Sequence, residues 1–266
     1  MSYKKTISYK FFMKSKYNCI KYTNYFKIYD KLFGEYRNKK IIFVEIGVFS
    51  GGSLFMWRNF FGNKARIVGI DLDPNAKKFE KYGFEIFIGD QSKREFWNKF
   101  FKKVGKVDII LDDGGHTNYQ QIMTTNCCIP MIRDNGKLVI EDVHTSFIKK
   151  KWYNPSKYSF INYSKKIIED INTRFPVIKS FNYSLKKYIY KIDFFESVVC
   201  FEINRKSCLE NKFIDNGKKS TSPIEQRNKL NEKHAFFKIK KYLNLKSNFT
   251  YPLFLINSLK LKKYFK

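Results

Sequence analysis

Carboxylates and imidazoles gather in two short stretches of the chain, each directly after a mainly apolar run. Residues 112–116 (DDGGH) follow the run at 107–111, and residues 141–144 (EDVH) follow the run at 137–140. If both runs are neighbouring strands of a parallel sheet, their carboxyl ends meet at one edge and bring these side chains together. Three carboxylates with one imidazole nearby suit a hard divalent cation such as Mg²⁺, which prefers oxygen ligands. The two stretches therefore predict a metal site.

A second group of candidate residues lies earlier in the chain. Glu45 ends the first expected strand and begins the stretch 45–53 (EIGVFSGGS), in which Gly47 lets the backbone turn tightly and approach a ligand. The next helix is expected to begin near Ser53, and a helix N-terminus favours polar and anionic ligand groups. The stretch lacks the Gly-Lys-Ser/Thr ending of a P-loop, so it is not read as one.

Polar side chains at the next two strand ends point to a nucleoside. Asp71 ends the second expected strand, where an acid can accept two hydrogen bonds from a ribose diol. Asp90 and Gln91 end the third strand, where a polar side chain could meet an adenine amino group. Each acid has a purely structural alternative, since Asp71 or the following Asp73 could cap a helix. Taken together, the three strand ends predict a nucleoside-cofactor site.

The hydrophobic pattern predicts an α/β fold. Apolar runs alternate with stretches that can form helices, as in repeated strand–helix–strand units. The expected strands are 41–44, 67–70, 84–88, 107–111 and 137–140, and the expected helices include 20–37, 93–103, 118–132 and 156–174. Residues 188–204 hold two β-rich runs with no helix between them, which indicates an antiparallel hairpin. We therefore expect a doubly wound, Rossmann-like, mainly parallel sheet with a C-terminal antiparallel hairpin strand.

The composition limits the classes of partner. The 266-residue chain has a formal net charge of +28, but arginine is a small minority of its 52 basic residues. Base and phosphate recognition favours arginine, so no nucleic-acid partner is expected. The sequence lacks an apolar run long enough for a transmembrane helix and an apolar secretory segment after its basic start. Five cysteines without CxxC spacing fit a reducing compartment. We expect a cytoplasmic protein, with the inner face of the membrane as an alternative.

The motifs also carry a family resemblance. Residues 20–204 resemble class I S-adenosylmethionine-dependent methyltransferases, and more narrowly the metal-dependent macrolide and sugar O-methyltransferases of the mycinamicin type and the related cephalosporin hydroxylase-like group. The matching segments are 44–48 (VEIGV), 51–54 (GGSL), 69–74 (GIDLDP), 89–92 (GDQS), 112–116 (DDGGH) and 141–146 (EDVHTS). The last two are specific, whereas the first is shared by many nucleotide-binding folds. One departure is Gly115, where the family often has serine.

The resemblance implies a role for each candidate residue. It implies Mg²⁺ bound by Asp113, Glu141 and Asp142, with His116 as the general base. Asp112 is expected to contact the cofactor, with helix capping as the alternative, and His144 either orients a ligand or is a packed imidazole. The residues expected around S-adenosylmethionine are Glu45, Gly47, Ser53, Asp71, Asp90, Gln91 and Asp112.

These observations predict a Mg²⁺-dependent S-adenosylmethionine O-methyltransferase that acts on a sugar hydroxyl of a glycan, nucleotide sugar or glycosylated metabolite. The alternatives are a hydroxylase-like relative on the same scaffold, and a basic module that binds nucleic acid or membrane without catalysis. We expect an N-terminal helical segment at 1–40, a cofactor-binding methyltransferase domain at 41–204 and a basic extension at 205–266. The extension is a candidate for peripheral membrane contact, and homo-oligomer formation is left open.

Overall fold

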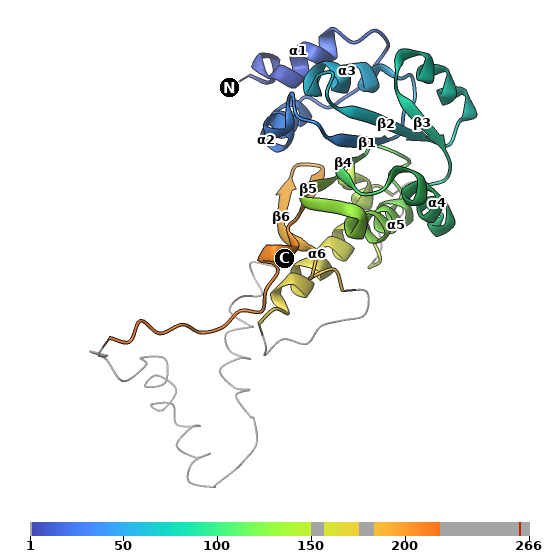
Figure 1. Ribbon diagram of the computed structural model, residues 1–266. Helices are drawn as coiled ribbons and strands as arrows, with labels where there is room; N and C mark the ends of the chain where they lie inside the picture. The colour runs from blue at the N-terminus through green and yellow to red at the C-terminus, as the bar shows by residue number, and fades with distance from the viewer. Residues whose placement is uncertain (1, 150–156, 176–183, 219–260, 262–266) are drawn as a thin grey trace, which may run out of the picture. The chain divides into compact units, whose positions relative to one another are not determined.

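A computed structural model describes residues 2–149, 157–175, 184–218 and 261 of the chain (Figure 1). The chain divides into two compact units, 1–212 and 213–266, and the second is described only at 213–218 and 261. Most of the lysine-rich extension therefore lies outside the described residues. Its predicted membrane contact and the three-part division of the chain stay predictions.

A seven-stranded sheet forms the centre of the first unit. Five strands are parallel, namely β1 (Ile42–Ile46), β2 (Arg66–Asp71), β3 (Glu85–Ile88), β4 (Val107–Asp112) and β5 (Ile132–Ile140). The antiparallel hairpin of β6 (Ile189–Phe195) and β7 (Val198–Ile203) completes the order β3-β2-β1-β4-β5-β7-β6. The predicted doubly wound, mainly parallel sheet with its C-terminal antiparallel hairpin is confirmed.

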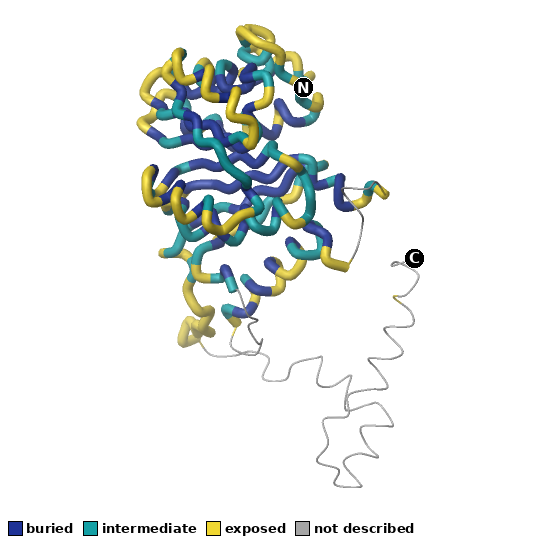
Figure 2. The backbone as a smooth tube through the Cα atoms, turned by 90° about the vertical axis from the view of Figure 1, so that its right-hand side faces the viewer, coloured by how far each residue is buried: buried dark blue, intermediate teal, exposed yellow. Residues whose placement is uncertain are grey.

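Helices cover both faces of this sheet (Figure 1). They are α1 (Ile7–Met13), α2 (Tyr25–Phe33), α3 (Gly52–Phe61), α4 (Arg94–Val104), α5 (Asn118–Cys128) and α6 (Phe160–Asn172). Alternate strand residues enter different cores, so Phe43 packs with α2 and α3 whereas Val44 packs with α4, α5 and α6. The inner strands β1, β2, β4, β5 and β7 are accordingly buried along most of their length, whereas the edge strands β3 and β6 are mostly half-buried or exposed (Figure 2).

Three predicted helices are shorter in the structure than in the sequence pattern, and the one expected over 156–174 spans Phe160–Asn172. The helix expected over 118–132 ends at Cys128, because Pro130 cannot continue it, and a short 3-10 helix leads into β5. The aromatic helix expected over 20–37 begins only at Tyr25. The residues before it are not helical, because they run across the carboxyl edge of the sheet. Among the described residues, no helix has the length and apolar character needed to cross a membrane.

Candidate active site

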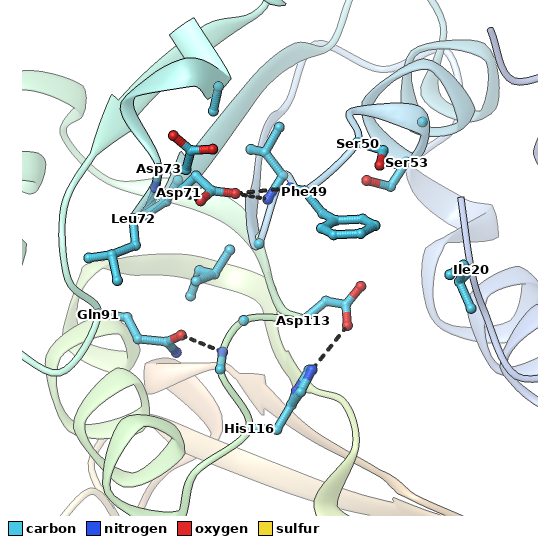
Figure 3. A pocket seen from close by; sticks show the side chains of 18 of the residues that line it. Ile20, Phe49, Ser50, Ser53, Asp71, Leu72, Asp73, Gln91, Asp113 and His116 are labelled. Carbon is cyan, nitrogen blue, oxygen red and sulfur yellow. Dashed lines mark hydrogen bonds and ion pairs between the residues drawn. The ribbon is translucent and has the colours of Figure 1, made fainter. Parts of the chain in front are cut away.

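Three neighbouring strands end at the same level of the sheet. Ile46 of β1 is paired with Asp112 of β4, and Asp112 is paired with Ile140 of β5. The residues that follow these strands therefore leave the sheet side by side, as the sequence pattern predicted. They border a cavity of about 670 Å³, a volume typical of small-molecule and cofactor sites (Figure 3).

Gly47 allows the loops after β1 and β4 to touch. Its φ is +92°, and a Cβ atom built on it would lie 2.1 Å from the carbonyl oxygen of Asp113. Any other residue would force these two loops apart. Gly47 lines the cavity, as does Ser53 in the first turn of α3. The sequence therefore located the tight backbone approach correctly, while their contact with a cofactor stays a prediction.

Asp71 and Asp73 stand at one end of the cavity, beside the exposed side chain of Leu72 (Figure 3). The Asp71 carboxylate accepts hydrogen bonds from the backbone N–H groups of Val48 at 2.8 Å and Phe49 at 2.9 Å. It thereby joins the loop after β1 to the end of β2, and its Oδ1 accepts a further hydrogen bond from the N–H of Asp73 at 2.8 Å. The sequence left open whether Asp71 or Asp73 caps a helix. Asp73 is the cap, since its Oδ1 accepts a hydrogen bond from the N–H of Asn75 at 2.9 Å.

Gln91 and Asp112 form a buried pair behind the loop at 113–116. Nε2 of Gln91 donates to both carboxylate oxygens of Asp112 at 3.0 Å, and Oε1 of Gln91 accepts from the N–H of Gly115 at 3.0 Å. Burial raises the pKa of Asp112, whose side chain does not line the cavity. Asp90 lines the cavity and accepts from the N–H of Ser92 at 2.8 Å. Asp112 thus fixes the loop that carries Asp113.

Glu45 is also buried away from the cavity lining. Its Oε2 accepts a hydrogen bond from Oγ of Ser53 at 2.7 Å, and its Oε1 accepts from Nε1 of Trp57 at 2.9 Å. Burial raises the pKa of the Glu45 carboxyl to about 7. The carboxyl therefore fastens α3 to the end of β1, and direct contact with a cofactor stays a prediction for both Glu45 and Asp112.

The other end of the cavity holds a group of potential metal ligands. Asp113, His116 and Asp142 each offer one atom, and the three atoms lie within 4.8 Å of one another. Nε2 of His116 lies 3.3 Å from Oδ2 of Asp142 and 3.8 Å from Oδ1 of Asp113. Nδ1 of His116 is buried and has no hydrogen-bond partner among the described residues. Two carboxylates at this spacing fit a hard divalent cation.

Glu141, the third predicted ligand, faces a different partner. Its fully buried carboxylate accepts from the hydroxyl of Tyr29 at 2.5 Å and from Nζ of Lys21 at 3.0 Å. The same ammonium also contacts Oδ2 of Asp113, and the Lys21 side chain is only 2% exposed. Burial alone would lower the pKa of Lys21, but Asp113 and Glu141 raise it well above its ordinary value. Burial raises the pKa of Glu141.

Asp142 belongs to a chain of hydroxyl contacts that leads to His144. The hydroxyl of Tyr25 donates to Oδ1 of Asp142 at 2.5 Å, and its oxygen lies 3.0 Å from Oγ of Ser197. Oγ of Ser197 in turn lies 2.5 Å from Nδ1 of His144, whose ring packs edge-on against Tyr22 at 5.6 Å. Nδ1 of His144 also lies 3.9 Å from Oδ1 of Asp142 itself. Both roles considered for His144, orienting a ligand and simple packing, stay predictions.

Several backbone positions at this edge are left-handed. The φ angles are +48° at Phe49, +56° at His116, +56° at Asp142 and +63° at Ser197. Oγ1 of Thr145 donates to the carbonyl oxygens of His116 at 2.9 Å and Asp142 at 2.8 Å, so one hydroxyl holds both of those turns. The arrangement keeps the His116 imidazole and the Asp142 carboxylate facing each other.

Four contacting residues were not predicted as part of the site: Lys21, Tyr25, Tyr29 and Ser197. Tyr25 and Tyr29 fall within the helix expected over 20–37, and their rings are buried in the core. Their hydroxyl groups nevertheless reach Asp142 and Glu141, and their four-residue spacing could have indicated a shared face. No local sequence pattern indicated that Lys21 or Ser197 belongs to the site.

Comparisons with known proteins identify this region. Residues 44–143 match the family model described as a methyltransferase domain. The mycinamicin VI 2''-O-methyltransferase of Micromonospora griseorubida is 33% identical over 126 residues, which are 45% of this chain and 31% of that protein. The demethylmacrocin O-methyltransferase of Streptomyces fradiae is 32% identical over the same shares of the two chains. This chain therefore spans about a third of the length of the curated relatives it matches.

A solved structure agrees with the sequence matches. The MycE methyltransferase from the mycinamycin biosynthetic pathway, in complex with Mg and SAH, has a TM-score of 0.61 and 25% identity over 76% of this chain and 52% of that chain. Residues 44–143 thus resemble a methyltransferase domain. The resemblance of the chain to the S-adenosylmethionine-dependent methyltransferases of the mycinamicin type is confirmed. The resemblance to the cephalosporin hydroxylase-like group stays a prediction.

The buried carboxyl of Glu45 predicts a pH-dependent contribution to stability. Its pKa is about 7 in the folded chain against an ordinary value of 4.5, so the folded state binds this proton more tightly. The stabilising contribution is complete below pH 4.5 and is lost as the pH rises through about 7. Glu45→Gln keeps an acceptor for Trp57 and cannot ionise.

The measurement is the free energy of unfolding of both proteins by urea between pH 4.5 and 8.5. As the pH rises over this range, the free energy of unfolding of the wild-type chain should fall by up to about 3 kcal/mol relative to that of Glu45→Gln. A difference between the two proteins that stays constant with pH would contradict this assignment.

Proposed function

We propose that this protein is a Mg²⁺-dependent, S-adenosylmethionine-using O-methyltransferase that acts on a sugar hydroxyl. The observation that carries the proposal is the cavity of the methyltransferase domain, which has Asp71 at one end and the cluster of Asp113, His116 and Asp142 at the other. One end suits a nucleoside and the other suits a proton-bearing acceptor. A methyl-transfer site needs both within one cavity.

The nucleoside end has the groups that S-adenosylmethionine requires. The Asp71 carboxylate can accept hydrogen bonds from ribose hydroxyls while it keeps its bonds to the N–H groups of Val48 and Phe49. The exposed side chains of Phe49 and Leu72 line the same cavity and offer apolar surface to an adenine ring. The cofactor supplies an already activated methyl group, so the main task of the chain is to align the acceptor with it.

The opposite end fits a divalent cation by its donor set. Asp113 and Asp142 would hold Mg²⁺, with Glu141 as the third ligand once its contact with Lys21 is released. Mg²⁺ keeps open coordination positions and lowers the pKa of a hydroxyl that binds to it. MycE, the solved structure described above, contains Mg and SAH together, which supports the same pair of cofactors here.

His116 is placed to remove the acceptor's proton. Its Nε2 faces Asp113 and Asp142, so a hydroxyl held between the cavity and these carboxylates would meet this atom. An imidazole is a suitable base near pH 7, because its proton affinity matches that pH.

The names of related proteins support a hydroxyl acceptor on a sugar. The relatives described above are named O-methyltransferases, and a further one, from Streptomyces olivaceus, is named for a rhamnosyl tetracenomycin. We infer a glycan, nucleotide sugar or glycosylated metabolite as the acceptor, handled in the cytoplasm. The remaining lysine-rich extension is assigned no part in the chemistry.

The first prediction separates cofactor binding from helix capping. Asp71→Ala should weaken S-adenosylmethionine binding roughly tenfold to a hundredfold, because hydrogen bonds to a charged acceptor are lost. Asp73→Ala is the matched control, since that neighbouring acid caps a helix and should change the affinity little. Isothermal titration calorimetry measures both. Equal affinities in the wild-type chain and Asp71→Ala would remove Asp71 from the cofactor site.

The second prediction concerns the metal. Excess EDTA should abolish methyl transfer from radiolabelled S-adenosylmethionine to glycosylated acceptors, and added Mg²⁺ should restore it, because the carboxylates alone cannot acidify a hydroxyl. Cofactor binding measured in EDTA is the control, since it reports that the domain remains folded. Undiminished transfer in EDTA would show that the acidic cluster works without a metal.

The third prediction tests the base. His116→Gln should lower turnover by about 10²–10⁴-fold while cofactor and Mg²⁺ binding persist, because only the proton acceptor is lost. His144→Gln is the comparison, and its effect should be smaller because His144 does not line the cavity and its Nδ1 lies 3.9 Å from Oδ1 of Asp142. Near-wild-type turnover of His116→Gln, with the chemical step rate-limiting, would make the assignment wrong.

A further inference from the structure

A non-helical segment crosses one side of the cavity. Residues 14–24, here called the strap, join α1 to α2, and several of them line the cavity, namely Asn18, Cys19, Ile20 and Lys21. Ile20 lies across from Asp113 and His116 in the close-up (Figure 3). The strap therefore forms part of the wall beside the acidic cluster.

The two ends of the strap are fastened differently from its centre. Ser15 donates to the carbonyl oxygen of Gly52 at 2.6 Å, and the hydroxyls of Tyr17 and Tyr82 lie 2.6 Å apart. Beyond Tyr22, the chain enters α2. Between these points, the Lys21 ammonium connects the strap to the sheet edge through Asp113 and Glu141.

Lys21 occupies a position that a divalent cation also needs. Its Nζ lies between Oδ2 of Asp113 and Oε2 of Glu141, which are donor atoms of two of the three expected metal ligands. An ammonium donates hydrogen bonds into the same oxygen lone pairs that a metal ion requires. The Lys21 ammonium and a metal ion that share these two carboxylates would also repel each other strongly, because the site is buried. Full coordination by Asp113 and Glu141 is therefore incompatible with the present position of Lys21.

We propose that Lys21 is a tethered cation that competes with the divalent cation for Asp113 and Glu141, so that metal binding requires the strap to move Lys21 out of the acidic cluster. This inference rests on the metal site of the proposed function and adds a built-in competitor to it. Because the strap is also a wall of the cavity, loading of the metal and opening of that wall become one event. The ammonium keeps Asp113 and Glu141 paired until then.

The direct test compares Mn²⁺ binding to the wild-type chain, Lys21→Met and Lys16→Met, followed by Mn²⁺ electron paramagnetic resonance. Lys21→Met should bind Mn²⁺ at least about tenfold more tightly than the wild-type chain, because it lacks the ammonium that occupies Asp113 and Glu141 in the absence of metal. Lys16→Met is the matched control on the same strap, since Nζ of Lys16 lies over the ring of Tyr82, 4.4 Å from its centroid. Its affinity should equal that of the wild-type chain.

Two results of this titration would overturn the proposal while leaving the metal site standing. They are equal affinity of the wild-type chain and Lys21→Met, and weaker binding by Lys21→Met. Absence of Mn²⁺ binding by all three proteins would overturn both the competition and the metal half of the proposed function.

Hydrogen–deuterium exchange of the wild-type chain provides a test that does not depend on the folding of a variant. Saturating Mn²⁺ should speed amide exchange in residues 14–24, because the Lys21 anchor is released. The amides of α4 serve as the internal reference, since that helix is held by its own core packing and has no residue in the acidic cluster. Unchanged or slower exchange in the strap with Mn²⁺ bound would overturn the proposal.

Discussion

The carboxyl edge of the sheet concentrates negative charge where water has little access. Glu45 and Glu141 are fully buried and Asp112 is nearly so. A buried charge is costly unless it is paired and hydrogen-bonded, so each of these acids needs a dedicated partner. Glu45 takes partners from α3, Asp112 takes the Gln91 amide, and Glu141 takes Lys21 and Tyr29. The loops around the cavity are arranged around this requirement.

The N-terminal segment supplies much of that compensation. Tyr25 and Tyr29 lie one helical turn apart, and their hydroxyls reach Asp142 and Glu141, which are adjacent in the chain. Their rings meanwhile pack into the core between α2 and the sheet. The helix therefore buries apolar surface with one part of each side chain and satisfies an acid with the other. This dual use ties the position of α2 to the integrity of the acidic cluster.

The fold and the location of the site were predictable because they depend on local patterns. Apolar runs identify buried strands, and parallel strands bring the residues after them to one edge. The different roles of the two acids in each adjacent pair, Asp112 with Asp113 and Glu141 with Asp142, were not predictable. Adjacent residues at a strand end point in different directions, so the sequence could not tell which of Asp112 and Asp113 faces the cavity. Lys21 is one of 52 basic residues, and its partners lie far along the chain.

Residues with a left-handed backbone conformation provide independent evidence on the role of the carboxyl edge of the sheet. Six described non-glycine residues have positive φ, and the asparagines, the aspartate and the histidine among them are of types that adopt it more often than others do. Four of the six lie in loops at the carboxyl edge of the sheet: Phe49, His116, Asp142 and Ser197. At Phe49 and Ser197, glycine would adopt the turn without the cost of about 1–2 kcal/mol that a side chain brings. The chain keeps non-glycine residues at these turns despite that cost. The backbone conformation alone therefore indicates that this edge of the sheet is selected for something other than stability.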